Sequence, residues 1–207
     1  ILSNKYASMQ FERITQEIRS TILTNVSQVM HIGASVGQEA EEYASRNLTV
    51  IWVEAIPEIY EKLLNNISKF KNQTAILALL GEVEGEETQF YLYGKDFMSS
   101  STFELEREES LEVGRSKNIQ FLIKRRLDSL ISFNEKIATV ALNSCKFLEV
   151  ECSSYQIYRK APLYQEVKKY MRDIGFIPII EPPSKFHGNI IFLRLEDFKH
   201  IDQANAD

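Results

Sequence analysis

Cysteine is scarce in this 207-residue sequence, which contains only Cys145 and Cys152. Two cysteines cannot form the disulfide framework that stabilises many small secreted domains. They lie seven residues apart in a segment that we predict as one strand or a strand plus a turn, about 23 Å apart if fully extended, so they cannot pair with each other unless the chain folds back. We therefore expect a protein of the reducing cytoplasm.

Long apolar runs and an excess of positive charge are also missing. A membrane-spanning helix needs about 20 consecutive apolar residues, and no run in the sequence approaches that length. We therefore predict no membrane span. Asp and Glu number 29 against 24 Lys and Arg, for a net charge of −5. A nucleic-acid site needs a basic face, so we expect no nucleic-acid partner, and we interpret the basic run at 124–126 as a solvated strand end.

Metal-binding patterns are missing as well. The three histidines and two cysteines form no cluster with acidic residues at the spacing of metal ligands, which predicts no metal site. Apolar residues, in contrast, are plentiful: 44% of the chain is hydrophobic, including 12 Phe, which is enough for a sizeable core. The length predicts one domain over residues 1–207, with residues 1–24 as a helical N-terminal extension packed on it.

A strand, a glycine turn, a helix and a second strand follow one another between residues 26 and 54. The turn contains Gly33 and Gly37, and the second apolar run stops at Glu54. Such a turn lets the backbone approach a ligand at the start of a helix, and the acid can accept hydrogen bonds from ribose hydroxyls. An ordinary βαβ unit with a tight turn would give the same pattern, so this segment alone leaves both interpretations open.

Strands and helices alternate along most of the predicted chain. Strands are predicted at 26–32, 48–53, 74–80, 88–93, 119–123, 146–151, 176–180 and 189–195. Helices are predicted at 2–23, 38–45, 57–67, 135–143 and 162–174, and a short connection at 127–131. The loop between the last two strands is too short for a crossover helix, so they should be antiparallel. The pattern predicts an α/β fold, a three-layer sandwich with a mostly parallel twisted sheet and a C-terminal antiparallel hairpin, of Rossmann-like type.

The glycine turn fits S-adenosylmethionine better than a dinucleotide. A dinucleotide site requires Gly-x-Gly-x-x-Gly, because the middle glycine lets the backbone close on the pyrophosphate. Counted from Gly33, Ser35 and Gln38 occupy the second and third glycine positions. The following helix also begins with acidic residues, which would repel a pyrophosphate. S-adenosylmethionine has no phosphate and its sulfonium charge tolerates an acidic surrounding, so we predict it as the cofactor.

Several segments occur together in an order typical of one protein family. They are His31-Ile32-Gly33-Ala34-Ser35-Val36-Gly37-Gln38-Glu39 with Tyr43, Trp52-Val53-Glu54-Ala55-Ile56-Pro57, Asn66, Ser99-Ser100-Ser101, Arg126-Leu127-Asp128-Ser129-Leu130, Glu151-Cys152-Ser153, Tyr158, Ala161-Pro162-Leu163-Tyr164, Gly175-Phe176 and Gly188-Asn189. In this combination, over about residues 25–195, the sequence resembles the FkbM-type methyltransferases, within the class I S-adenosylmethionine-dependent fold.

The resemblance implies cofactor contacts at the ends of the first three strands. The implied contacts are His31, Gly33, Ala34, Ser35 and Gly37 at the turn, Glu54 on the ribose, Ala55 and Ile56 beside the adenine, Gly81 and Glu82 near its edge, and Ser100 in a serine cluster beside the cofactor or the acceptor. His31 departs from the family, which often has an acid there, but an imidazole can still accept a hydrogen bond.

A second departure is the absence of the family's Asp-x-Gln-Gly-x-Glu segment, which ends a central strand. It should lie between Leu130 and Leu142, where the sequence is too short for a strand, a turn and a helix start. Losing a central strand would leave its neighbours without ladder partners. Either residues are missing from the sequence at this point, or the protein is a degenerate and inactive relative.

Two residues are candidates for the base that takes the acceptor proton. Glu151 ends a strand that faces the site, and His187 lies in the C-terminal hairpin. Glu151 could equally orient a loop, and His187 could be a plain surface residue. The resemblance implies O-methylation of a sugar, polysaccharide or secondary-metabolite hydroxyl, hence a small-molecule or glycan acceptor. The alternatives are a non-catalytic cofactor-binding relative and an NAD-binding oxidoreductase, and self-association into a homo-oligomer stays open.

Overall fold

The computed structural model describes residues 2–93, 97, 99–106, 117–132 and 145–196 of the chain. The chain forms two compact units. We call residues 21–102 and 112–138 the glycine-turn unit, and residues 1–20, 103–111 and 139–207 the hairpin unit. The expected single domain over residues 1–207 and its three-layer arrangement stay predictions.

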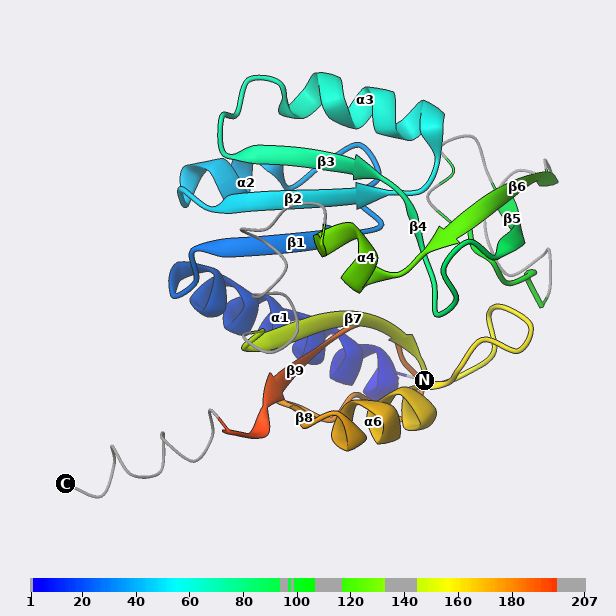
Figure 1. Cartoon of the computed structure of the whole chain (residues 1–207). Coiled ribbons are helices and arrows are strands. Elements are labelled where there is room, and N and C mark those ends of the chain that lie inside the picture. Colours follow the sequence, from blue (N-terminus) through cyan, green and yellow to red (C-terminus); the bar gives the residue numbers. More distant parts are fainter. Residues whose placement is uncertain (1, 94–96, 98, 107–116, 133–144, 197–207) are drawn as a thin grey trace. The chain divides into compact units, whose positions relative to one another are not determined.

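The glycine-turn unit is built on a parallel sheet with the strand order β1-β2-β3. Its elements are β1 (Gln28–Ile32), α2 (Ala40–Ser45), β2 (Thr49–Glu54), α3 (Pro57–Ile67), β3 (Gln73–Leu77), β4 (Leu79–Leu80), β5 (Glu87–Tyr93), β6 (Lys117–Arg125) and α4 (Leu127–Ser132). Figure 1 shows the three strands side by side, with α3 running along them. Because the carboxyl ends of parallel strands meet at one edge, the turn after β1 and Glu54 at the end of β2 are brought together, as in one half of a doubly wound fold.

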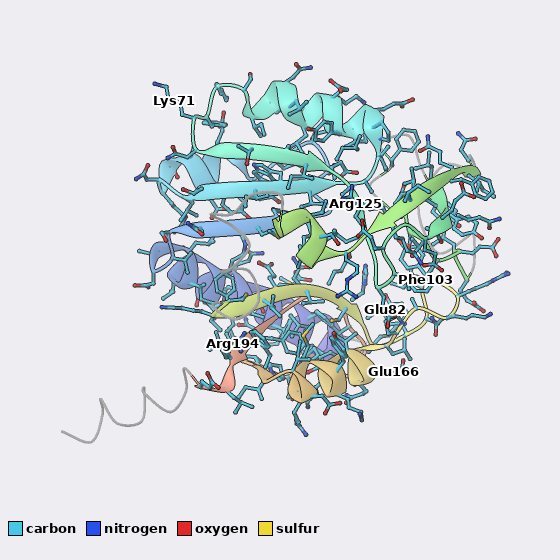
Figure 2. The ribbon with its side chains drawn as sticks, viewed as in Figure 1. Lys71, Glu82, Phe103, Arg125, Glu166 and Arg194 are labelled. Carbon is cyan, nitrogen blue, oxygen red and sulfur yellow. The ribbon has the colours of Figure 1, made fainter. Side chains whose placement is uncertain are left out.

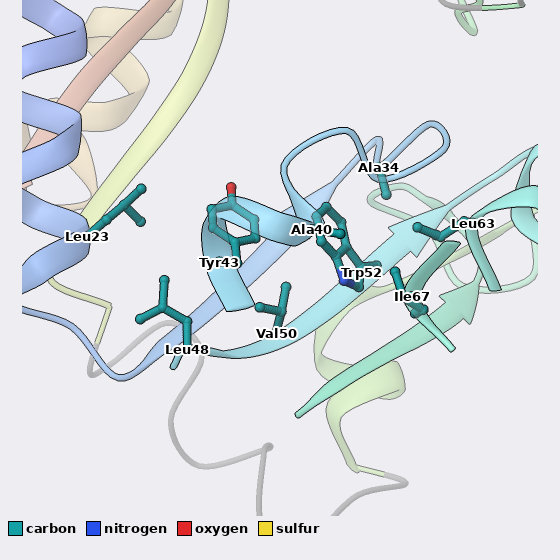
Figure 3. Close-up of a cluster of buried hydrophobic side chains, with 9 residues drawn as sticks. All are labelled: Leu23, Ala34, Ala40, Tyr43, Leu48, Val50, Trp52, Leu63 and Ile67. Atoms are coloured by element: carbon teal, nitrogen blue, oxygen red, sulfur yellow. The ribbon is translucent and has the colours of Figure 1, made fainter. Parts of the chain in front are cut away.

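One face of this sheet carries the largest core cluster of the unit. Val50 and Trp52, two residues apart on β2, are fully buried against α2 and α3, and Figure 3 shows Trp52 close to Ala40 of α2. The cluster comprises Leu23, Ala34, Ala40, Tyr43, Leu48, Val50, Trp52, Leu63 and Ile67. Burial of each large apolar side chain contributes about 1.5–3 kcal/mol, so this face anchors both helices.

The chain changes sheets after β3, where the sequence predicted one continuous strand over 74–80. The amide of Ala78 donates to the Glu54 carbonyl oxygen at 2.9 Å, and β4 then pairs in parallel with β6. Strand β5 pairs with β6 in the antiparallel direction. At the end of β6, Lys124 pairs with Glu86 and Arg125 with Glu84, each at 2.6 Å, and Arg125 is labelled in Figure 2. Two residues of the basic run at 124–126 are therefore neutralised by glutamates.

The hairpin unit contains a second, entirely antiparallel sheet with the order β7-β9-β8. Its elements are most of α1 (Leu2–Thr24), β7 (Phe147–Ser153), α6 (Tyr164–Asp173), β8 (Phe176–Pro178) and β9 (His187–Arg194). The core packs Phe11 of α1 with Cys152, Tyr164, Phe176, Phe186, Ile190 and Phe192. The antiparallel pairing of β8 with β9 confirms the C-terminal hairpin expected from the short loop.

The prediction of a mostly parallel sheet is wrong in detail. The described strands form three sheets, in which β1–β2, β2–β3 and β4–β6 are parallel while β5–β6, β7–β9 and β8–β9 are antiparallel. Residues predicted as a short connection at 127–131 form α4 instead. The helix predicted at 135–143 and the place of the absent acidic segment lie outside the described residues.

The described residues contain neither a helix that could span a membrane nor a metal-binding cluster. No described helix is long and apolar enough to cross a bilayer. Within the same ranges, no group of three His, Cys, Asp or Glu side chains lies close enough together to hold a metal ion.

Candidate functional site

The turn after β1 is held on the end of β2 by backbone hydrogen bonds. The amides of Gly33 and Ala34 both donate to the carbonyl oxygen of Val53, at 2.9 and 3.0 Å. Gly33 has φ of 73° and Gly37 of 74°, a region that favours glycine. Ser35 also has a positive φ, 47°, which is uncommon for a residue with a side chain. Two backbone hydrogen bonds thus hold a turn that includes a strained residue, Ser35.

The two glycines serve different purposes. A Cβ added to Gly33 would have no atom within 4 Å, whereas a Cβ on Gly37 would lie 2.7 Å from Cδ1 of Leu63 on α3. Gly33 is therefore required for the backbone conformation alone. Gly37 is required for conformation and for the close approach of the turn to α3.

Glu54 ties the turn to the loop that follows β2. Its Oε2 accepts a hydrogen bond from the Ser35 amide at 2.8 Å, and its Oε1 accepts from the amides of Ala55 and Ile56, both at 2.9 Å. The residue is only 6% exposed. A carboxylate oxygen offers two acceptor sites, so Oε1 is saturated and Oε2 retains room for one further donor.

A cavity of about 330 Å³ opens where the turn, the end of β2 and the serine cluster meet. This volume lies within the range of about 300–1,000 Å³ of small-molecule sites. Its walls are Ile32, Gly33, Ser35, Val53, Glu54, Ala55, Ile56, Ile59, Ala78, Leu79, Leu80, Phe90, Phe97, Ser100, Ser101 and Thr102. Most of these are apolar, and a few polar groups lie among them, as is usual for a ligand site.

Glu54 is the only side chain among those described walls that is an acid or a base. The remaining polar groups are hydroxyls of Ser35, Ser100, Ser101 and Thr102. A ligand in this cavity would therefore meet one carboxylate and no Lys, Arg or His from these walls. Such a surrounding disfavours an anion and suits a neutral or cationic group.

Six of the predicted cofactor residues are brought together at this cavity. They are Gly33, Ser35, Glu54, Ala55, Ile56 and Ser100. The hydroxyl oxygen of Ser100 accepts a hydrogen bond from the Tyr93 amide at 3.3 Å, and Ser101 forms an antiparallel bridge with Tyr91. The serine cluster is thereby fixed beside β5.

His31 and Ala34 face the core of the sheet and are not among the walls. The His31 ring stacks on Trp52 with centroids 5.0 Å apart, and its Nδ1 is 3.2 Å from the Tyr43 hydroxyl. Ala34 is 1% exposed in the same core cluster. Because alternate residues of a strand share a face, the core-facing position of His31 could have been predicted from the apolar Val29 two residues earlier.

Gly37, Gly81 and Glu82 also lie apart from the cavity walls. A Cβ on Gly81 would lie 2.5–3.0 Å from the aliphatic stem of Lys124, so Gly81 packs beneath that side chain. Glu82 is exposed, and its carbonyl accepts a hydrogen bond from Arg126 at 3.5 Å. The roles assigned to these three residues and to His31 and Ala34 stay predictions.

Most apolar walls of the cavity were missed by the sequence analysis. The missed apolar residues are Ile32, Val53, Ile59, Ala78, Leu79, Leu80, Phe90 and Phe97, and the polar Thr102 was missed with them. The alternation along β5, which buries Phe90 and Leu92, was a signal for a covered face. The alternation does not identify the segment that covers this face. That segment is the loop and helix after β2, which contribute Ile56 and Ile59.

The two candidate bases contact each other in the hairpin unit. Nε2 of His187 is 3.2 Å from Oε1 of Glu151, although the two side chains are 38% and 68% exposed. They come from neighbouring strands, with Glu151 opposite Asn189 and His187 opposite Ser153. Glu151 also contributes to raising the pKa of Cys152 to about 11, after burial, which is the main cause.

Comparisons with known proteins find similarity among solved structures alone. No family model matches the chain, and neither does any curated protein. Among solved structures, the chain is similar to a 1,6-didemethyltoxoflavin-N1-methyltransferase of Burkholderia thailandensis with bound S-adenosylhomocysteine, at 11% identity and a TM-score of 0.40, over 81% of this chain and 70% of that one.

Two further solved structures are similar at the same level. The glycopeptide N-methyltransferase MtfA in complex with S-adenosylmethionine has 10% identity and a TM-score of 0.33, over 81% of this chain and 86% of that one. A Pyrococcus horikoshii protein provisionally assigned as an RNA methyltransferase has 12% identity and a TM-score of 0.39, over 81% and 74%.

Proposed function

We propose that the protein is an S-adenosylmethionine-dependent methyltransferase of FkbM type that transfers a methyl group to a hydroxyl of a sugar, polysaccharide or secondary metabolite. The observation that carries this proposal is the cavity between the glycine turn and Glu54. It combines an acid at the end of the second strand with walls that offer no positive charge among the described residues.

The cavity supports S-adenosylmethionine over a dinucleotide on electrostatic grounds. A pyrophosphate carries two negative charges and is normally bound by free backbone N–H groups of a glycine-rich turn. Here the amides of Gly33, Ala34 and Ser35 already donate to Val53 and Glu54. When bound, S-adenosylmethionine supplies a methyl group activated by a sulfonium centre, and its positive charge is compatible with the carboxylate of Glu54.

Glu54 would hold the cofactor through the acceptor position that remains on Oε2. One ribose hydroxyl can donate there while the three backbone bonds persist. The apolar walls, including Ile56 and Phe90, would exclude water from the rest of the ligand. Methyl transfer is an in-line displacement, so this positioning supplies much of the rate.

The proton of the acceptor hydroxyl requires a base. We propose Glu151 or His187 for that role, and their mutual contact at 3.2 Å suggests that they would act as a pair. The acceptor is proposed from the family resemblance, because acceptor pockets are formed by loops whose shape a sequence does not give.

Calorimetric titration with S-adenosylmethionine and with NAD tests the proposed cofactor. We expect heat of binding with S-adenosylmethionine and none with NAD, because the walls among the described residues include no Lys, Arg or His for the pyrophosphate. Heat with NAD alone would replace the proposal by an NAD-binding oxidoreductase.

Turnover separates the enzyme from a non-catalytic relative that has kept the pocket, an alternative motivated by the absent Asp-x-Gln-Gly-x-Glu segment. Transfer of labelled methyl from S-adenosylmethionine to a panel of glycans and hydroxylated metabolites is expected with the wild type. The variants Glu151→Gln and His187→Asn should slow it without changing cofactor affinity. Binding without transfer to any acceptor would favour the non-catalytic relative.

A further inference from the structure

We infer that Asn66 of α3 is a positioning residue that fixes the glycine turn in the conformation needed for cofactor binding. Nδ2 of Asn66 donates to the carbonyl oxygen of Val36 at 2.8 Å, across 30 residues of sequence. Asn66 is not a wall of the cavity, and its effect is exerted through the turn. The inference rests on the proposed function.

The position of Asn66 follows from the geometry of α3. Residues three and four apart lie on one side of a helix, so Leu63, Asn66 and Ile67 point in a similar direction. Leu63 and Ile67 are buried and lie against Gly37, where an added Cβ would be 2.7 and 3.6 Å from their side chains. Asn66 itself is exposed and adds a hydrogen bond at the border of this apolar contact.

The turn needs such a contact because its backbone is held in an unfavourable region. Val36 lies between Ser35, with φ of 47°, and Gly37, with φ of 74°. A positive φ at Ser35 persists only where the surroundings determine it. Glu54 provides one such restraint through the Ser35 amide at 2.8 Å, and Asn66 provides the next one along the chain, at the Val36 carbonyl.

The hydrogen bond from Asn66 to Val36 affects cofactor affinity by changing the fraction of molecules whose glycine turn has the binding-competent conformation. Ligand affinity falls in proportion to the fraction of molecules in which the binding-competent conformation is present. Loss of one hydrogen bond of ordinary strength favours the open turn about fivefold, and this factor is divided between faster exchange of the turn amides and a smaller competent fraction. A surface hydrogen bond without this role would leave affinity unchanged.

Four variants and two measurements test the inference. Asn66→Ala removes the donor, and Asn66→Asp keeps the size but replaces the donor by an acceptor. Asn65→Ala and Asn65→Asp are matched controls, because Asn65 is the neighbouring exposed asparagine on the same helix. Hydrogen exchange of the Gly37 amide is measured without ligand, with the Val50 amide of β2 as the reference, and the Kd for S-adenosylmethionine is measured by calorimetry.

The expected result is local and specific to position 66. Both Asn66 variants should leave the Val50 amide unchanged, speed exchange of the Gly37 amide and raise the Kd, with these two factors multiplying to about fivefold, whereas both Asn65 variants match the wild type. Unchanged Gly37 exchange, equal acceleration at Val50, or unchanged Kd would each overturn the inference alone. Absence of binding by the wild type would overturn the proposed function, and the positioning role with it.

Discussion

Gly33 and Gly37 illustrate how two residues of the same type can be needed for different physical reasons. Both have positive φ, so any L-residue is strained there by about 1–2 kcal/mol. Gly33 borders open space, while Gly37 abuts the buried side chain of Leu63. The sequence showed both glycines but not this difference, because Leu63 is 26 residues further along the chain.

The two alanine variants should therefore differ in stability. Gly33→Ala is expected to lower the free energy of unfolding by about 1–2 kcal/mol, the conformational cost alone. Gly37→Ala should lower it by about 2–5 kcal/mol, because the new Cβ also overpacks against Leu63. Urea unfolding of both variants measures the difference, and equal losses would contradict the tight contact between the turn and α3.

The sequence predicted that the glycine turn and Glu54 lie close together, because parallel strands bring their carboxyl ends to one edge of a sheet. Glu54 closes an apolar run and follows the turn by one βαβ repeat, so its approach to Ser35 was foreseeable from the parallel pairing of two strands. The saturation of its Oε1 by Ala55 and Ile56 was not foreseeable, because it depends on the backbone path of the loop after β2.

At the scale of elements, the sequence did not predict features that depend on contacts between distant segments. Helix α4 was expected to be a plain connection, but Glu84, more than 40 residues earlier, accepts hydrogen bonds from the Arg126 amide and the Ser129 hydroxyl at its start. An acid at the beginning of a helix satisfies orphan N–H groups and suits the dipole. Hydrogen bonds to these groups also hold the pKa of Glu84 below its usual range.

Helix α6 is fastened to the loop before β9 by Glu181. This carboxylate accepts a hydrogen bond from the Tyr164 hydroxyl at 2.8 Å and another from Lys168. Burial alone would raise the pKa of Glu181, but the hydrogen bonds from Lys168 and Tyr164, with the charges of Lys168 and Arg172, hold it below its usual range. Burial and the contact with Glu181 raise the pKa of Tyr164.

The stabilisation by Glu181 should depend on pH. Because its pKa is lowered in the folded protein, the contribution is complete above the unfolded value of about 4.3 and is lost as the pH falls through the folded value. We expect Glu181→Gln to cost about 1 kcal/mol or less near pH 7, since the side chain is partly exposed. Unfolding of both proteins measured from pH 7 to 3 should show the difference shrinking at the acid end. A constant difference would contradict the lowered pKa.

At the scale of the whole molecule, the composition and the order of elements indicated an α/β protein, and the β1-α2-β2-α3-β3 half follows that expectation. The remaining topology did not, because the sequence pattern cannot tell which strand is the neighbour of which. For example, the sequence did not predict that β4 leaves β3 and pairs with β6. This pairing places Leu79 and Leu80 in the cavity wall.

The central claim is that the cavity beside Glu54 takes S-adenosylmethionine, and one titration tests it most directly. The Kd is measured by calorimetry for the wild type, for Glu54→Ala and for Glu61→Ala, an exposed control on α3, after thermal melts have shown each to be folded at the titration temperature. Loss of a hydrogen bond to a charged acceptor should weaken binding to Glu54→Ala by about 1.5–3 kcal/mol, or roughly 10- to 150-fold, and leave Glu61→Ala unchanged. A folded Glu54→Ala that binds as tightly as the wild type would contradict the account.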